Sequence, residues 1–171
     1  MFEIGDLIVY GTNGVCRVDG MSRSPYDAGD DREYYVLKPL YDQANSVIYT
    51  PVTNENVVMR PLLSREKAGE LLARISDIAA ITVDNERSRR DVYREALRTT
   101  DPVNYVRIVK AVPRRREEFS RTRRRLPDLD IDFEHSAYCC LLGELSEVLG
   151  ISRGELDERI SVMLGKKPER A

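Results

Sequence analysis

The stretch FEIGDLIVYGTNGVCRV, residues 2–18, decides the fold of the first part of the chain. Two runs rich in aliphatic residues, LIVY at 7–10 and VCRV at 15–18, flank the residues GTNG. Glycine and asparagine tolerate the positive φ of tight turns, so the pattern predicts a β-hairpin. Neither the GxxxxGK[ST] nor the GxGxxG spacing of phosphate-binding loops is present, and a strand rather than a helix is expected next. GTNG is therefore interpreted as a turn and not as a ligand loop.

Three further runs at residues 33–40, 46–52 and 57–62 are enriched in valine, isoleucine and tyrosine. Polar segments at 22–32, 41–45 and 53–56 join them. Short strands at such close spacing predict a small, strongly bent sheet or a partly open barrel. The proline that ends SVIYTPV, residues 46–52, favours an edge position for that strand because proline has no N–H to donate.

The apolar period changes to that of a helix after Ser64, which is a candidate N-cap. Helices are predicted after Ser64, from residue 84 or 85 to about 97, from Asp101 and Pro102, over residues 133–149, and from Ser152 onward. Pro113 predicts a kink or an end in the third of these helices. The fold class is therefore segregated α+β, with a β domain over residues 1–62 and an all-α domain of four or five helices over 63–171.

The composition excludes several functional classes. The chain has 171 residues, 42% of them hydrophobic and 33% charged, and no apolar run approaches the roughly 20 residues that span a bilayer, so a soluble cytoplasmic protein without a membrane partner is expected. The three cysteines form no CxxC motif and are expected to be buried and structural. A single histidine, His135, supports neither a zinc site nor a catalytic triad. We therefore expect no enzyme activity, cofactor, metal or small-molecule substrate.

Charge is concentrated in one block. Residues 86–125 contain 14 basic and 6 acidic residues, whereas the rest of the chain is acidic, which predicts a local polyanion-binding surface. The planar guanidinium of arginine suits bidentate phosphate contacts. The alternative is a solvated surface in which neighbouring glutamates and aspartates neutralise the arginines. The candidate nucleic-acid-binding residues are Arg87, Arg89, Arg90, Arg94, Arg114, Arg115, Arg116, Arg121, Arg123, Arg124 and Arg125.

The order of motifs, with residues 2–18 followed by YYVLKPL, TPV and MRPL and then by helices, resembles the CarD/CdnL family of bacterial transcription regulators. The same amino-terminal part resembles the RNA-polymerase-interacting module of transcription-repair coupling factors. The resemblance implies an SH3- or Tudor-like five-stranded barrel that adds an edge strand to the β subunit of RNA polymerase. It also implies a helical domain that contacts promoter DNA and modulates the stability of the open complex.

Carried onto this chain, the resemblance assigns two sets of residues. The polymerase-binding residues would be Arg23, Ser24, Val47, Ile48, Tyr49, Thr50 and Pro51. Tyr49 stands where several relatives carry an arginine, and Arg87 stands where several carry a tryptophan that wedges into the minor groove. A guanidinium can enter the groove but cannot unstack a base step, so DNA contact with less help to melting is expected.

Two alternatives use the same residues differently. The arginines of residues 86–125 could bind structured RNA, which would make the protein an RNA- or ribosome-binding adaptor. A protein adaptor without a nucleic-acid role would require these arginines to be satisfied within the protein.

Overall fold

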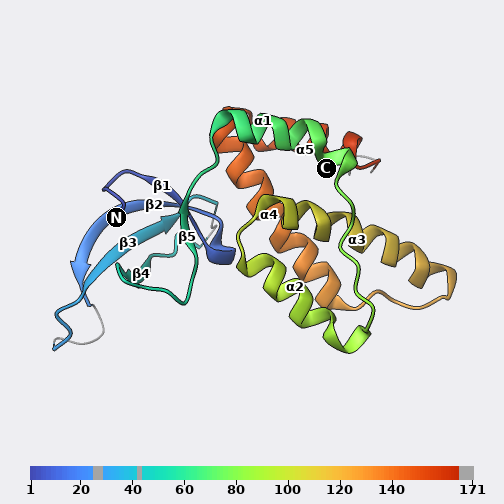
Figure 1. Ribbon diagram of the computed structural model, residues 1–171, viewed down its shortest axis with the longest axis horizontal. Coiled ribbons are helices and arrows are strands. Elements are labelled where there is room, and N and C mark those ends of the chain that lie inside the picture. Colours follow the sequence, from blue (N-terminus) through green and yellow to red (C-terminus); the bar gives the residue numbers. More distant parts are fainter. Residues whose placement is uncertain (25–28, 42–43, 166–171) are drawn as a thin grey trace.

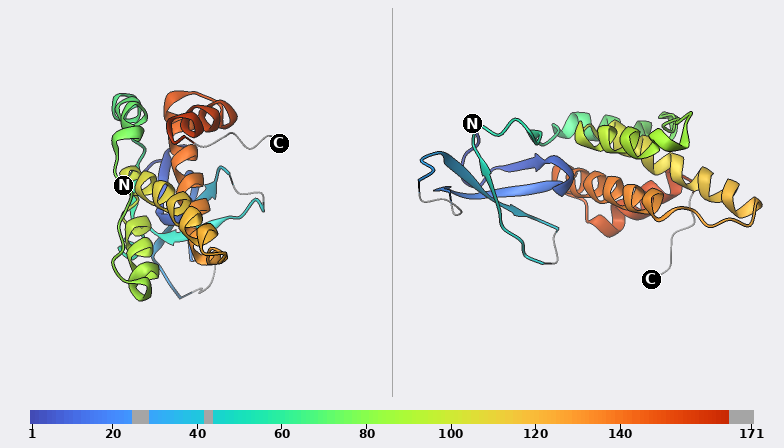
Figure 2. Two further views of the ribbon diagram at one scale, coloured as in Figure 1. Left: turned by 90° about the vertical axis from the view of Figure 1, so that its right-hand side faces the viewer. Right: turned by 90° about the horizontal axis from the view of Figure 1, so that it is seen from below.

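The computed structural model describes residues 1–24, 29–41 and 44–165 (Figure 1). The strands gather at one end of the molecule, and the helices extend away from them. The view from below shows the same arrangement, with the sheet beside the helices along the long axis (Figure 2, right). The predicted segregated α+β class is confirmed.

The described residues form a single antiparallel sheet with strand order β4-β3-β2-β1-β5. Its strands are β1 (Leu7–Tyr10), β2 (Val15–Arg23), β3 (Glu33–Pro39), β4 (Ile48–Pro51) and β5 (Met59–Pro61). The predicted barrel is wrong, because among these residues β4 and β5 stay at opposite edges and do not pair. These edge strands span four and three residues, and each pairs on one side only, β4 with β3 and β5 with β1. The pairing of β2 with β3 is interrupted by a register shift between Val18 and Gly20.

GTNG is a turn, as predicted. Gly11–Asn13 form a single 3-10 turn, η1, between β1 and β2, which pair with Val9 opposite Val15. Gly11 and Gly14 have φ angles of 48° and 70°, in the region that favours glycine. A Cβ at Gly11 would lie 2.7 Å from the Val57 side chain, so a larger residue has no room there.

The described helical part contains five α-helices, in agreement with the predicted four or five. They are α1 (Arg65–Arg74), α2 (Arg89–Arg98), α3 (Pro102–Arg121), α4 (Asp128–Leu149) and α5 (Arg153–Met163), with short 3-10 turns η2 (Ile75–Asp77) and η3 (Glu86–Ser88). The predicted caps Ser64, Asp101 and Ser152 each accept a backbone hydrogen bond from the first turn of their helix. α3 does not end at Pro113 but continues to Arg121. No helix in the described ranges has the length and apolar character of a bilayer-spanning segment.

The turn η1 also forms part of the contact between sheet and helices. A Cβ at Gly14 would lie 3.6 Å from the Cys140 sulfur of α4, and the Cys140 thiol donates to the Thr12 carbonyl over 3.5 Å. Cys16 and Cys140 are buried, and burial raises the pKa of their thiols to about 12 and about 11. These two cysteines are buried as predicted, whereas Cys139 is only half-buried.

Candidate functional site

The predicted edge strand does lie at an edge. β4 is the last strand of the sheet and pairs on its inner side with β3, with Thr50 opposite Tyr35 and Pro51 opposite Tyr34. Within the described residues no strand covers its outer side. An uncovered edge strand can pair with a strand of another protein through its backbone. The sequence correctly located this edge through Pro51.

Five of the residues assigned to polymerase binding lie in β4 or directly before it. Val47 precedes the strand and is 50% exposed, whereas Thr50 is buried and its hydroxyl accepts a hydrogen bond from the Asn54 amide over 2.8 Å. Ile48, Tyr49 and Pro51 are half-buried. Arg23 ends β2 with an exposed side chain, opposite Glu33 of β3, and Ser24 follows it. Arg23 and Ser24 are therefore separated from β4 by strand β3.

The arginine-rich segments meet at the other end of the molecule. η3, the start of α2 and the start of α4 lie together in the part of the helical region that points away from the sheet, and the end of α3 projects beyond them (Figure 1). We call this region the distal end. It contains arginines from residues 87–94 and 114–125, two segments that are far apart in the sequence.

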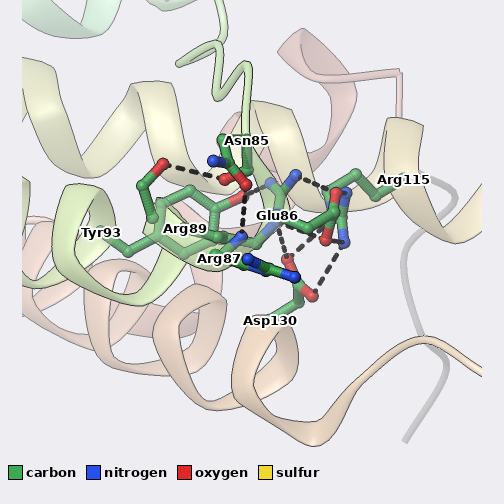
Figure 3. A network of polar contacts seen from close by, with 8 residues as sticks. Asn85, Glu86, Arg87, Arg89, Tyr93, Arg115 and Asp130 are labelled. Atoms are coloured by element: carbon green, nitrogen blue, oxygen red, sulfur yellow. Dashed lines mark hydrogen bonds and ion pairs between the residues drawn. The ribbon is translucent and has the colours of Figure 1, made fainter.

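Two of the predicted nucleic-acid-binding arginines are buried at the distal end. Arg89 is 7% and Arg115 is 9% exposed, and both guanidinium groups are occupied within the protein (Figure 3). Arg115 donates to Asp130 over 3.0 Å and to both carboxylate oxygens of Glu86 over 2.7 and 3.0 Å. Arg89 donates to Glu86 over 2.6 Å and to the Tyr93 hydroxyl over 3.1 Å. We call Glu86, Arg89, Arg115 and Asp130 the distal network.

The two arginines of the distal network stabilise the charged form of Glu86. Hydrogen bonds from Arg89 and then from Arg115 lower the pKa of this carboxyl to about 2. Asp130 is fully buried, and Nε of Arg89 lies 4.0 Å from Oδ1, the same carboxylate oxygen that Nε of Arg115 contacts over 3.0 Å. Because a buried carboxylate is strongly unfavourable without charged partners, Arg115 cannot leave Asp130 to bind another anion.

The other predicted arginines are exposed. Four of them form surface ion pairs, namely Arg94 with Asp91, Arg116 with Glu134, Arg121 with Glu117 and Arg125 with Asp128. Arg124 lies over the Phe119 ring at 5.3 Å. In the part of the chain that the structure describes, no carboxylate pairs with Arg87, Arg90, Arg114 or Arg123. Because exposed ion pairs contribute little free energy, phosphate groups can replace the carboxylates at the paired arginines. The arginines without a carboxylate partner can bind phosphate without breaking an ion pair.

Sequence reasoning missed the distal network. Asp128 and Asp130 occupy the first turn of α4, where acidic side chains also occur because they complement the helix dipole. Glu86 is one of several acidic residues that lie beside arginines in the sequence of residues 86–125. The partners of Arg115 lie 15 and 29 positions away in the sequence, so no helical spacing indicates them.

Comparison with known protein families covers the sheet and not the helices. Residues 2–63 match the family described as the CarD-like/TRCF RID domain. The match includes all five strands and ends before α1 begins at Arg65. A search of curated proteins found no match to the chain. Residues 2–63 are therefore identified as a CarD-like/TRCF RID domain, the RNA-polymerase-interacting domain that the resemblance in sequence predicted.

Proposed function

We propose that the protein is a non-enzymatic transcription regulator that binds the β subunit of RNA polymerase through β4 and contacts promoter DNA through its distal end. The observation that carries the proposal is the match of residues 2–63 to the CarD-like/TRCF RID domain, in which β4 offers an uncovered edge. Strand addition at such an edge satisfies backbone donors and acceptors on both partners.

The position of the arginines supports the DNA contact. Arg87 and Arg90 are exposed and have no carboxylate partner in the described chain, and Arg114 and Arg123 share these properties. Guanidinium groups bind phosphates bidentately and enter narrow minor grooves. Arg89 and Arg115 have a supporting role in this proposal, because their guanidinium groups are buried. Arg87 replaces an apolar wedge, so the proposed contact positions DNA without opening a base step.

The two surfaces lie at opposite ends of the molecule (Figure 2). A protein held by β4 on the polymerase would therefore extend its distal end away from the docking site, where DNA on the polymerase could reach it. Such a bridge modulates the open complex when it contacts that complex more strongly than the closed one.

The polymerase contact is tested with Val47→Glu in the full-length protein. A charged side chain beside the edge strand opposes strand addition, so binding to purified RNA polymerase should weaken by about tenfold or more. Val162→Glu is the matched control, because Val162 is 72% exposed on α5, away from the sheet. The proposal is wrong if the wild-type protein does not bind polymerase at micromolar concentration, or if ribosomal proteins co-purify with it in place of polymerase subunits.

A further inference from the structure

We infer that Arg115 and Asp130 are positioning residues for DNA contact: through Glu86 they hold η3, and with it Arg87 and Arg90, in one orientation at the distal end. The inference rests on the proposed function, because it concerns the same arginines. It assigns to two buried residues an effect on DNA binding that they cannot produce by touching DNA.

Asp130 is the fixed point of this arrangement. It lies in the first turn of α4 and is fully buried, and Arg115 of α3 donates to its two oxygens over 3.0 and 3.4 Å. Removing a partner from a buried carboxylate is strongly unfavourable, so this pair stays formed. The orientation of the Arg115 guanidinium relative to α4 is thereby set.

The outer edge of the same guanidinium holds Glu86. Its two terminal nitrogens donate to the two oxygens of Glu86 over 2.7 and 3.0 Å, a bidentate geometry (Figure 3). Because the guanidinium is planar and rigid, fixing one edge on Asp130 also fixes the direction in which the other edge presents its donors. The position of Glu86 is therefore determined by α3 and α4 as well as by its own turn.

Few other contacts can hold η3 in place. It is a 3-10 turn of three residues, none of which is buried, so apolar packing does not hold it. Asn85 accepts a hydrogen bond from the Arg87 backbone over 2.9 Å, and Arg89 binds Glu86 from the following turn, but these contacts are local to residues 85–89. The hydrogen bonds that Arg115 donates to Glu86 are the contacts of the distal network that tie η3 to a helix other than α2, which follows η3 directly in the chain.

The inference predicts a change in DNA affinity opposite to the one that net charge alone predicts. Glu86 is a negative charge beside Arg87, so its removal by Glu86→Gln should tighten binding to DNA if only net charge matters. If Glu86 positions η3, the same change releases the turn, and DNA binding then has to order Arg87 and Arg90 again. Glu117→Gln is the matched control, since Glu117 is exposed to nearly the same degree and pairs with Arg121 within α3.

The experiment measures binding of the full-length variants to a short fluorescent DNA duplex at low salt, together with amide hydrogen exchange. We expect Glu86→Gln to weaken binding by roughly three- to tenfold, whereas Glu117→Gln leaves it unchanged or up to about threefold tighter. Exchange at the amides of residues 86–90 should accelerate in Glu86→Gln alone. Equal tightening by both variants, or unchanged exchange in Glu86→Gln, would overturn the inference.

A second pair of variants keeps all charges. Arg115→Lys retains the positive charge but loses the planar fork, and Arg98→Lys makes the same change at an exposed arginine of α2 that binds Glu95 through two hydrogen bonds and is not among the candidate DNA-binding residues. Weaker DNA binding by Arg115→Lys alone supports positioning, and equal effects of the two changes contradict it. If the wild-type protein fails to bind the duplex, the proposed DNA contact is wrong, while the exchange of residues 86–90 in Glu86→Gln still decides whether Glu86 holds the turn.

Discussion

Arg60 of β5 and Glu144 of α4 form a bidentate ion pair across the junction between sheet and helices, with nitrogen to oxygen distances of 2.6 and 2.8 Å. Glu144 is 1% exposed and also accepts the backbone N–H of Leu63 over 2.9 Å. The same guanidinium donates to the carbonyl of Thr100, a residue with a φ of 55°. This ion pair therefore joins the end of the sheet, the start of the helical part and the connection between α2 and α3.

Removal of Arg60 should destabilise the whole molecule. Arg60→Met leaves the carboxylate of Glu144 buried without its charged partner, so we expect the free energy of unfolding to fall by about 2–4 kcal/mol in chemical denaturation. Arg17→Met, at the exposed pair with Asp19, should cost less than about 1 kcal/mol. Adding Glu144→Gln to Arg60→Met should recover part of the loss, and a double variant as unstable as the single one would show that the buried charge is not the cause.

The glycines of the β1–β2 turn should not tolerate alanine. Gly11→Ala places a Cβ 2.7 Å from Val57 in a backbone conformation with φ of 48°, so we expect a loss of roughly 2 kcal/mol or more in the free energy of unfolding. Gly154→Ala, in the first turn of α5 where no atom lies within 4 Å of the added methyl group, should instead gain up to about 1 kcal/mol. Thermal unfolding of the two variants measures both effects, and a neutral Gly11→Ala would contradict this account of the turn.

Alanine substitutions at two adjacent arginines should affect different properties, protein stability at Arg89 and DNA binding at Arg90. Arg89→Ala removes a buried guanidinium from Glu86 and Tyr93 and should lower the free energy of unfolding by about 2 kcal/mol. Arg90→Ala should change it by less than about 0.5 kcal/mol, because the side chain is exposed. In DNA titrations at several salt concentrations, Arg90→Ala should reduce the slope of log affinity against log salt by about 0.9 if one phosphate contact is lost. An unchanged slope would remove Arg90 from the DNA surface.

Acid should weaken the distal network within a defined pH range. The pKa of Glu86 is lowered to about 2 by Arg89 and Arg115, so this group stabilises the folded state above its ordinary pKa near 4.5 and loses that effect as the pH falls toward 2. Glu86 is 65% exposed, so solvent screening keeps the contribution below about 1 kcal/mol. The difference in unfolding free energy between wild type and Glu86→Gln should be present at pH 7 and vanish near pH 2. A difference that stays constant from pH 7 to 2 would contradict this assignment.

Local signals in the sequence predicted the secondary structure well. Glycine and asparagine at the β1–β2 turn, Pro51 at the edge strand, and the caps Ser64, Asp101 and Ser152 each act within a few residues, so their effect is visible without the fold. The prediction of a barrel failed, because closure depends on whether strands distant in the sequence pair with each other. Closure into a barrel requires the two edge strands to pair, and their length and separation are set by the whole sheet.

The sequence by itself determined that a β part precedes four or five helices, that Pro51 lies at an edge, and that arginines are concentrated in residues 86–125. Turn chemistry, apolar period and charge are properties of local sequence. Only the tertiary structure decided which arginines face solvent. Arg89 and Arg90 are neighbours with the same side chain, yet one is buried and the other exposed. The physical reason is that the acidic partners of Arg115 are distant from it in the chain: Asp130 reaches it only when α3 and α4 pack together, and Glu86 only when η3 lies against α3.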